Sequence, residues 1–235
     1  MPASLPDRPR VLVGCAKLPP RMSRAHYFGG LSLLETDVVF RGQPRPASLR
    51  RWRREAPDHA RFAVVAAAAV THDGCFRPGP VRDRGWDATR RAAEALAADA
   101  IVFRSGPGVS PSAANRDAMR AFFAAAAADV DAALVWIPGG LWTPVDARAF
   151  AAEAGVIAAE DPLAREPGEP PAPPPSPGPR YLRVEGLGRR TVRDDDLEVI
   201  ADALADAPSA WVVFAHPDRW RTARALRARL DDAGD

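Results

Sequence analysis

The sequence predicts an α/β fold, a TIM-like (β/α) barrel of about eight parallel strands, for three reasons. Eight short apolar runs recur along the 235 residues. Most are separated by Ala-, Arg- and Leu-rich segments long enough for a crossover helix. The runs are too apolar for either face to lie in water, which is typical of a parallel sheet covered by helices. A barrel of this kind needs about 250 residues. We therefore expect one domain that spans residues 1–235.

Each expected strand is an apolar run that ends in turn or polar residues. In chain order, the expected strands span residues 11–15, 36–42, 61–72, 100–106, 133–140, 155–162, 181–186 and 211–217. Since the carboxyl ends of barrel strands carry the reacting groups of such enzymes, the polar residues that close these runs are the first candidates for a site.

The segments between the strands predict the outer helices. Residues 22–34 have a helical apolar spacing that Gly29 and Gly30 weaken. A clearer helix begins near Pro46 and stops at Pro57. Residues 72–86 have no helical period and predict a long loop. Further helices are expected at 86–98, 111–128, 144–154, 193–206 and 217–232.

One crossover is expected to lack its helix. Residues 162–179 contain nine prolines among eighteen residues. Proline removes a backbone donor and favours extended polyproline conformations. We therefore expect a Pro-rich loop to replace the helix between the sixth and seventh strands.

Composition limits the classes of partner. Lys and Arg total 32 against 30 Asp and Glu, which gives a formal charge of +2 and no strong nucleic-acid signal. Nearly all of these cations are arginine, since Lys17 is the only lysine. Two cysteines are too few for a disulfide framework, and no apolar run is long enough for a signal peptide or a membrane span. These features favour a cytoplasmic protein without a membrane partner, and leave its oligomeric state open.

Several of the runs form an ordered pattern: ETDVVFRGQP, RFAVVAAAAVTH, IVFRSGP, YLRVEG and WVVFAHP. In this order and spacing, the chain resembles the YecE-like family, also called domain of unknown function 72, over nearly its whole length. The resemblance implies a TIM-like barrel and a family whose activity is unassigned. Positions that match the family's motifs are Glu35, Phe40, Pro44, Phe62, Val64, Thr71, His72, Tyr181, Arg183 and Gly186.

The chain also departs from the resembled family. Val65 replaces a lysine on strand three, and residues 135–140 replace a charged cluster on strand five. Glu185 replaces a histidine on strand seven, while Ala215 and His216 stand where an asparagine pair is usual. These substitutions remove natural ligand groups and leave inherited chemistry in question.

Three residues are the candidate catalytic groups. His72 is an imidazole on a matching family position and suits a general acid or base near neutral pH. Glu35 and Glu185 are its candidate carboxylate partners. The structural alternative is that His72 and Thr71 hold the following loop by hydrogen bonds.

Four further residues are candidate substrate-binding groups: Arg183, Arg104, Asp161 and Trp142. A guanidinium inside an apolar strand needs a partner, so Arg183 predicts either a pair with Glu35 or Glu185, or a bound phosphate or carboxylate. Arg104 presents the same choice. Asp161 precedes Pro162 and could equally start a turn. Trp142 could stack a sugar or base, or cap the core. His216 joins the wider pool with a capping role as its alternative.

Two functions follow from these groups. The first is an enzyme that acts on a small polar, phosphorylated or sugar-like substrate at the carboxyl-terminal mouth of the barrel, with a small-molecule anion as ligand. The second is a noncatalytic ligand-binding or regulatory protein that has lost polar residues of the family. The sequence assigns no cofactor, since no nucleotide-binding loop is present. A metal site remains an alternative, because His72, Asp161, Glu185 and His216 offer nitrogen and carboxylate ligands suited to zinc or manganese, although no tight ligand spacing supports it.

Overall fold

The computed structural model describes residues 11–164, 178–186 and 192–232. Their strands form one closed barrel in sequence order, and every neighbouring pair is parallel. The strands are β1 (Val11–Ala16), β2 (Leu33–Thr36), β3 (Arg61–Val65), β4 (Ala100–Arg104), β5 (Ala133–Ile137), β6 (Ile157–Glu160), β7 (Arg180–Val184) and β8 (Ala210–Phe214). The predicted TIM-like barrel is confirmed.

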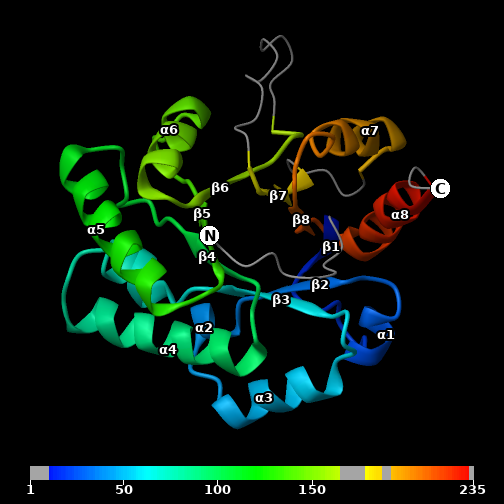
Figure 1. Ribbon diagram of the computed structural model, residues 1–235, viewed down its shortest axis with the longest axis horizontal. Coiled ribbons are helices and arrows are strands. Elements are labelled where there is room, and N and C mark those ends of the chain that lie inside the picture. The colour runs from blue at the N-terminus through cyan, green and yellow to red at the C-terminus, as the bar shows by residue number, and fades with distance from the viewer. Residues whose placement is uncertain (1–10, 165–177, 187–191, 233–235) are drawn as a thin grey trace.

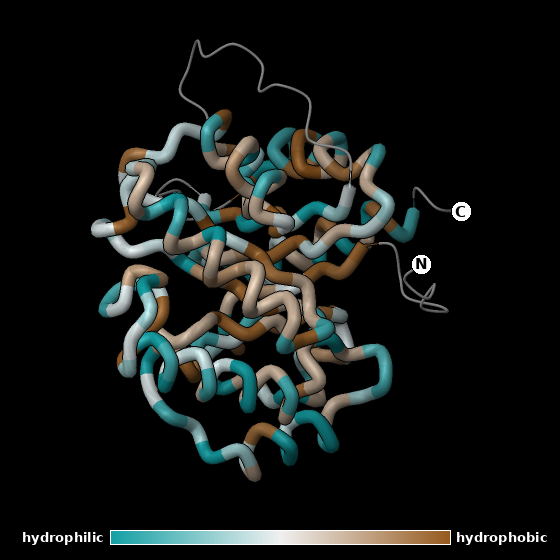
Figure 2. The backbone as a smooth tube through the Cα atoms, turned by 60° about the vertical axis from the view of Figure 1, so that its left-hand side comes forward, coloured by the Kyte–Doolittle hydropathy of each residue, from teal (hydrophilic) through white to brown (hydrophobic). Residues whose placement is uncertain are grey.

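Helices surround the strands (Figure 1). They are α1 (Arg24–Phe28), α2 (Val38–Arg41), α3 (Pro46–Glu55), α4 (Pro80–Leu96), α5 (Ala113–Asp129), α6 (Pro144–Ala154), α7 (Asp194–Asp202) and α8 (Arg219–Asp232), with one π-helical turn, η1 (Ala69–Asp73). Hydrophobic segments concentrate towards the inside and hydrophilic ones on the outer helices (Figure 2). Among the described residues, none of the helices is both long and apolar enough to cross a bilayer.

The core has two layers, because each strand alternates its side chains between the barrel interior and the helices. The interior holds mostly small and branched side chains, such as Ala63, Val65, Val102 and Val213. Aromatic side chains such as Phe103 lie on the opposite face and pack beneath the helices. The charged side chains on the inner face therefore collect at the strand ends, above this apolar filling.

Gly14 permits the close approach of β1 to β2. A Cβ atom at this position would lie 1.8 Å from the backbone oxygen of Leu33, which is its partner in the register of the two strands. No side chain fits that space, so the pairing of β1 with β2 depends on this glycine.

The second strand was misplaced by the sequence prediction of residues 36–42. It runs instead from Leu33 to Thr36, and Val38–Arg41 form α2. An apolar run this short does not distinguish strand from helix by its period. Strand pairing decides which residues form the strand, because Leu33 and Glu35 align with Arg61 and Ala63 of β3.

Several other predicted bounds differ from the structure, three of them in segments near the mouth or the first helix. The third strand ends at Val65, since the alanines that follow have high helix propensity and lead into η1. The loop expected at 72–86 is shorter, because α4 begins at Pro80, a residue well suited to a first helical position. The helix expected within 22–34 is limited to α1, capped by Ser23.

The crossover between β6 and β7 contains no helix in the described residues. Most of the predicted Pro-rich loop of residues 162–179 lies outside the described residues, which resume at Gly178.

Candidate functional site

Charged side chains gather at the carboxyl ends of the strands, a region we call the mouth. Glu35, Arg104 and Arg183 each lie two residues beyond an interior residue of their own strand. A spacing of two keeps a side chain on the same face of a strand. These three groups therefore belong to the inner face of the barrel wall.

A buried ion pair joins β2 to β7. Glu35 is 2% exposed and accepts hydrogen bonds at 3.2 Å from Nε of Arg183 on both of its carboxylate oxygens. The hydroxyl of Tyr181 donates a second bond to Oε2 of Glu35 at 2.8 Å. Burial, followed by the charge of Glu35, raises the pKa of Tyr181 well above its usual value, so the phenol keeps the proton that it donates.

Arg183 also pairs with the carboxylate of Glu185, whose side chain is about half exposed. The structure thus pairs Arg183 with both glutamates proposed from the sequence. The backbone N–H of Glu185 donates to Oδ2 of Asp161 at 2.9 Å, and the other oxygen of Asp161 accepts from Leu163. Asp161 therefore holds the ends of β6 and β7 together.

Asp161 is half-buried, and this burial raises the pKa of its carboxyl above the usual value. The hydrogen bond from Leu163 and the charges of Arg183 and His216 act in the opposite direction. His216, 2% exposed, follows β8 and packs at the turn of Gly186 after β7. The ends of three successive strands consequently share one electrostatic environment.

Arg104 occupies the opposite side of the mouth, at the end of β4. Its guanidinium is half-buried and lies 5.9 Å from the ring centroid of Phe40. It forms no hydrogen bond or ion pair with the residues that the structure describes. Burial, and then the charge of Arg183, lower the pKa of Arg104, while Glu35 and Asp37 raise it. Arg104 is thus a partly desolvated cation without a bonded carboxylate among these residues.

His72 lies in η1, which follows β3 after a short connection, and its ring packs in a T-shaped arrangement with that of Phe40 at a centroid distance of 5.2 Å. Its Nδ1 shares a hydrogen bond of 2.9 Å with the hydroxyl of buried Thr71. This bond leaves Nε2 as the nitrogen for a ligand. Gly106 makes room for the imidazole, because a Cβ atom there would lie 3.0 Å from the ring.

Asp37, which follows β2, holds two cations. Its Oδ2 lies 2.9 Å from Nζ of Lys17, and its Oδ1 lies 2.8 Å from Nη2 of Arg41. Lys17 follows β1 with a φ of 70°, a left-handed conformation that costs a non-glycine residue on the order of 1–3 kcal/mol. Asp37 is buried, whereas half of the Lys17 side chain is exposed.

Trp142 is not brought together with the mouth residues. It is 8% exposed and packs with Trp136 and Phe150 in the core beneath the helices. Its Nε1 donates to the backbone oxygen of Val109 at 2.9 Å, and Arg116 covers its ring at 4.6 Å. Every face of this side chain already has a protein neighbour.

Three residues of the mouth escaped the sequence reasoning: Lys17, Phe40 and Tyr181. Lys17 is the only lysine of the chain, and this fact could have marked it as a candidate residue. Phe40 and Tyr181 matched family positions but appear as apolar residues inside apolar runs. Their roles appear only in the structure: Phe40 contacts Arg104 and His72, and Tyr181 donates a hydrogen bond to Glu35.

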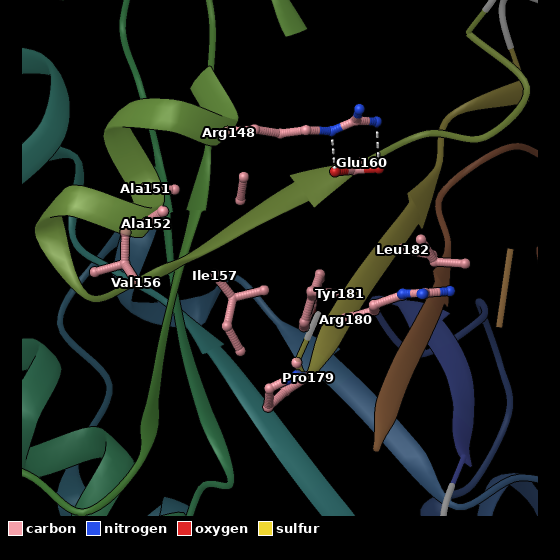
Figure 3. A pocket seen from close by; sticks show the side chains of 12 residues that line it. Arg148, Ala151, Ala152, Val156, Ile157, Glu160, Pro179, Arg180, Tyr181 and Leu182 are labelled. Carbon is pink, nitrogen blue, oxygen red and sulfur yellow. Dashed lines mark hydrogen bonds and ion pairs between the residues drawn. The ribbon is translucent and has the colours of Figure 1, made fainter. Parts of the chain in front are cut away.

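A groove of about 170 Å³ lies outside the barrel, between α6 and the strands β6 and β7 (Figure 3). Its walls are mainly apolar, with Val156, Ile157 and Leu182 among them. Arg148 and Glu160 form a bidentate pair at its edge, with bonds of 2.6 and 2.9 Å. It occupies the flank where the described residues provide no crossover helix, and it contains none of the charged residues of the mouth.

Cys15 is buried at the end of β1, and this burial raises its thiol pKa to about 12. The thiolate is the reactive form, so Cys15 stays protonated and inert at neutral pH. We expect a thiol reagent at pH 7.5 to modify only Cys75 in the folded protein and both cysteines in denaturant, counted by mass spectrometry. Modification of Cys15 at the rate of Cys75 before unfolding would contradict its burial.

A search of the described residues finds no group of three or more His, Cys, Asp or Glu side chains arranged to hold a metal ion. Within the described residues, the mouth thus consists of arginine–carboxylate pairs, one lysine–carboxylate pair, two imidazoles and one arginine without a bonded partner.

Comparison with known proteins identifies a family and a fold. The family model described as "Protein of unknown function DUF72" matches residues 15–232. The search of curated proteins found no match.

Two solved structures described as DUF72 family proteins are similar to this chain. One, from Thermotoga maritima, is 15% identical with a TM-score of 0.71, over 94% of this chain and 99% of that chain. The other, from Enterococcus faecalis, is 14% identical with a TM-score of 0.69, over 94% and 97% of the two chains. A xylose isomerase domain containing protein from Salmonella typhimurium is 11% identical with a TM-score of 0.60, over 97% of each chain. At these identities, the likeness shows the shared barrel fold alone.

Proposed function

Since this chain belongs to the DUF72 family, whose description assigns no activity, we propose that it is an enzyme acting on a small polar, phosphorylated or sugar-like substrate at the barrel mouth. Barrels of this architecture react at the carboxyl ends of their strands. The similar Salmonella structure, described as containing a xylose isomerase domain, supports a sugar-like substrate by analogy of fold.

Arg104 carries the proposal. A half-buried guanidinium has lost part of its hydration and needs compensation by hydrogen bonds or charge. Among the described residues, Arg104 has a ring contact with Phe40 but no bonded carboxylate. The charge of Arg183 adds repulsion, which lowers the pKa of Arg104. A phosphate or carboxylate group of a ligand would relieve both effects with bidentate hydrogen bonds.

The charges around the mouth give the substrate an orientation. Lys17 and Arg41 pair with Asp37, and the charges of Glu35 and Asp37 both act on Arg104. On the side of β6 and β7, Arg183 lies among three carboxylates: Glu35, Glu185 and Asp161. The anionic end of a substrate would lie at Arg104, and its hydroxyl groups would face Glu185.

We assign proton transfer to His72 and Glu185. Nε2 of His72 is available because Nδ1 is held by Thr71, and imidazole is the side chain that most often serves as a general acid or base in catalysis. The half-exposed carboxylate of Glu185 can accept a substrate hydroxyl proton. Glu35 is better suited to positioning Arg183, because both of its oxygens already accept hydrogen bonds. Asp161 has a structural role, since it accepts backbone hydrogen bonds from Glu185 and Leu163. Trp142 lies in the core beneath the helices and is not assigned to substrate binding.

The test is thermal unfolding with inorganic phosphate, a hexose phosphate and the same hexose without phosphate. A ligand present at 100 times its Kd stabilises by about 2.7 kcal/mol, which raises Tm by roughly 5–10 °C at this chain length. We expect the hexose phosphate to raise Tm and Arg104→Gln to abolish the rise.

Arg54→Gln is the matched control, since Arg54 is exposed near the end of α3 away from the mouth and loses the same charge. It should keep the full rise in Tm. A rise of equal size in Arg104→Gln would refute an anion site at Arg104.

A noncatalytic ligand-binding protein is the second candidate, favoured by the engagement of both Glu35 oxygens within the protein. The two candidates differ in turnover. Incubation of the stabilising compound with the protein, followed by mass spectrometry, should yield product that His72→Gln fails to form. Stabilisation without product from the unaltered protein would favour the binding role.

A further inference from the structure

Lys17 is the only lysine in a chain with 32 lysine and arginine residues. Where a surface position needs only a positive charge, this sequence uses arginine. Arg41 demonstrates this on the same carboxylate that Lys17 contacts, since it pairs with the other oxygen of Asp37. The presence of lysine beside it indicates a requirement that a guanidinium does not meet.

The backbone at Lys17 supports a specific role. The residue directly follows β1 and has a φ of 70°, a region that L residues other than Asn and Asp rarely occupy. Its N–H donates to the backbone oxygen of Glu35 at 2.8 Å, which ties the end of β1 to β2. Glycine would fit this conformation with less strain, yet the position carries a long cationic side chain.

The geometry at Asp37 leaves part of the ammonium free to bind. Nζ of Lys17 lies 2.9 Å from Oδ2 of Asp37, while half of the lysine side chain is exposed. An ammonium has three N–H donors, and this contact uses one of them. Asp37 also acts on the charge of Arg104, which places both cations in the same electrostatic environment.

We propose that Lys17 is a ligand-binding residue of the mouth, whose ammonium bridges the Asp37 carboxylate and an oxyanion of the substrate that Arg104 also binds. This inference rests on the proposed function. The compact ammonium directs its remaining donors to the ligand. An arginine at this position would instead match its planar fork to both oxygens of Asp37.

Pyridoxal 5′-phosphate tests this contact directly, because it is an anion that carries an aldehyde. The unprotonated Nζ bonds to the aldehyde carbon, the carbonyl oxygen leaves as water, and an imine forms. Borohydride then adds hydride to the imine carbon and the nitrogen takes a proton, giving a stable secondary amine. The chain has one lysine, so peptide mass spectrometry separates this product from that of the α-amino terminus, the other primary amine that the aldehyde can modify.

The comparison compound is 5′-deoxypyridoxal, which carries the same aldehyde without the phosphate. The rate of Lys17 labelling by each compound is divided by the rate at which that compound reacts with free Nα-acetyl-lysine. We expect the normalised rate to be at least about tenfold higher for pyridoxal 5′-phosphate. Inorganic phosphate should slow the first reaction, and Arg104→Gln should remove most of the difference. Equal normalised rates, without protection by phosphate, would overturn the inference.

Two substitutions test whether an ammonium is required. Lys17→Gln removes the charge and Lys17→Arg keeps it, and we expect both to lose the rise in Tm that a hexose phosphate produces. A full rise in Lys17→Arg would show that charge alone suffices and would contradict the bridging role.

The two proposals can fail separately. If Arg104→Gln abolishes the rise in Tm while both Lys17 variants retain it, the anion site stands and the role of Lys17 is wrong. If no probe raises Tm and the normalised labelling rates are equal, both are wrong. Phosphate-dependent labelling of Lys17 without any product from the hexose phosphate would support the anion contact and contradict the enzymatic role.

Discussion

Replacing Glu35 by alanine is expected to lower the free energy of unfolding by about 3 kcal/mol, because truncating one partner of a buried ion pair leaves the other charge uncompensated. Arg183 would keep its pair with the half-exposed Glu185 and the longer-range charge of Asp161, and the buried hydroxyl of Tyr181 would lose its acceptor. At this chain length the loss corresponds to a fall in Tm of roughly 6–12 °C. Calorimetry at pH 7 measures it.

Two variants separate the contributions to this effect. Tyr181→Phe removes one hydrogen bond and should cost about 1 kcal/mol. Glu35→Gln keeps the shape and one oxygen acceptor but removes the charge, so its loss of stability should lie between those of the other two variants. A fall in Tm of under about 2 °C in Glu35→Ala would mean that the pair between β2 and β7 contributes little to the fold.

Gly14→Ala is expected to destabilise the barrel by about 3 kcal/mol or more, at the upper end of the range for overpacked interiors. The added methyl group would lie 1.8 Å from the backbone oxygen of Leu33, so β1 and β2 would have to separate. A backbone oxygen in a strand cannot move aside as a flexible side chain can. Urea unfolding, with comparison of midpoints, measures the loss.

Gly42→Ala is the matched control for this substitution. Its φ of −175° is extended backbone that any residue adopts, and a Cβ atom there would come no closer than 3.9 Å to a neighbouring atom. Its midpoint should stay near that of the unaltered protein. If Gly14→Ala unfolds at the same urea concentration as Gly42→Ala, the close approach of β1 and β2 is more pliable than the structure indicates.

The barrel itself could be predicted from the sequence, because eight apolar runs that alternate with helical segments have few other ways to bury both faces of each strand. The positions of Arg104 and Arg183 near strand ends followed from the same pattern. His72, expected to close the third strand, lies instead in η1, beyond the end of that strand at Val65. The second strand could not be placed, since the short run of Val38 to Phe40 suits either a helix or a strand until pairing with β1 and β3 selects Leu33–Thr36.

The partners of the site residues were decided by the tertiary structure alone. Glu35 and Arg183 are 148 residues apart in sequence and meet because the barrel closes. Trp142 follows β5, yet the local turn directs it beneath the helices rather than towards the mouth. Lys17 was already distinguished by composition, but the contact with Asp37 exists only once β1 and β2 are paired. Local sequence determines which residues end the strands, whereas closure of the sheet determines which of them share one dielectric environment and can therefore act together.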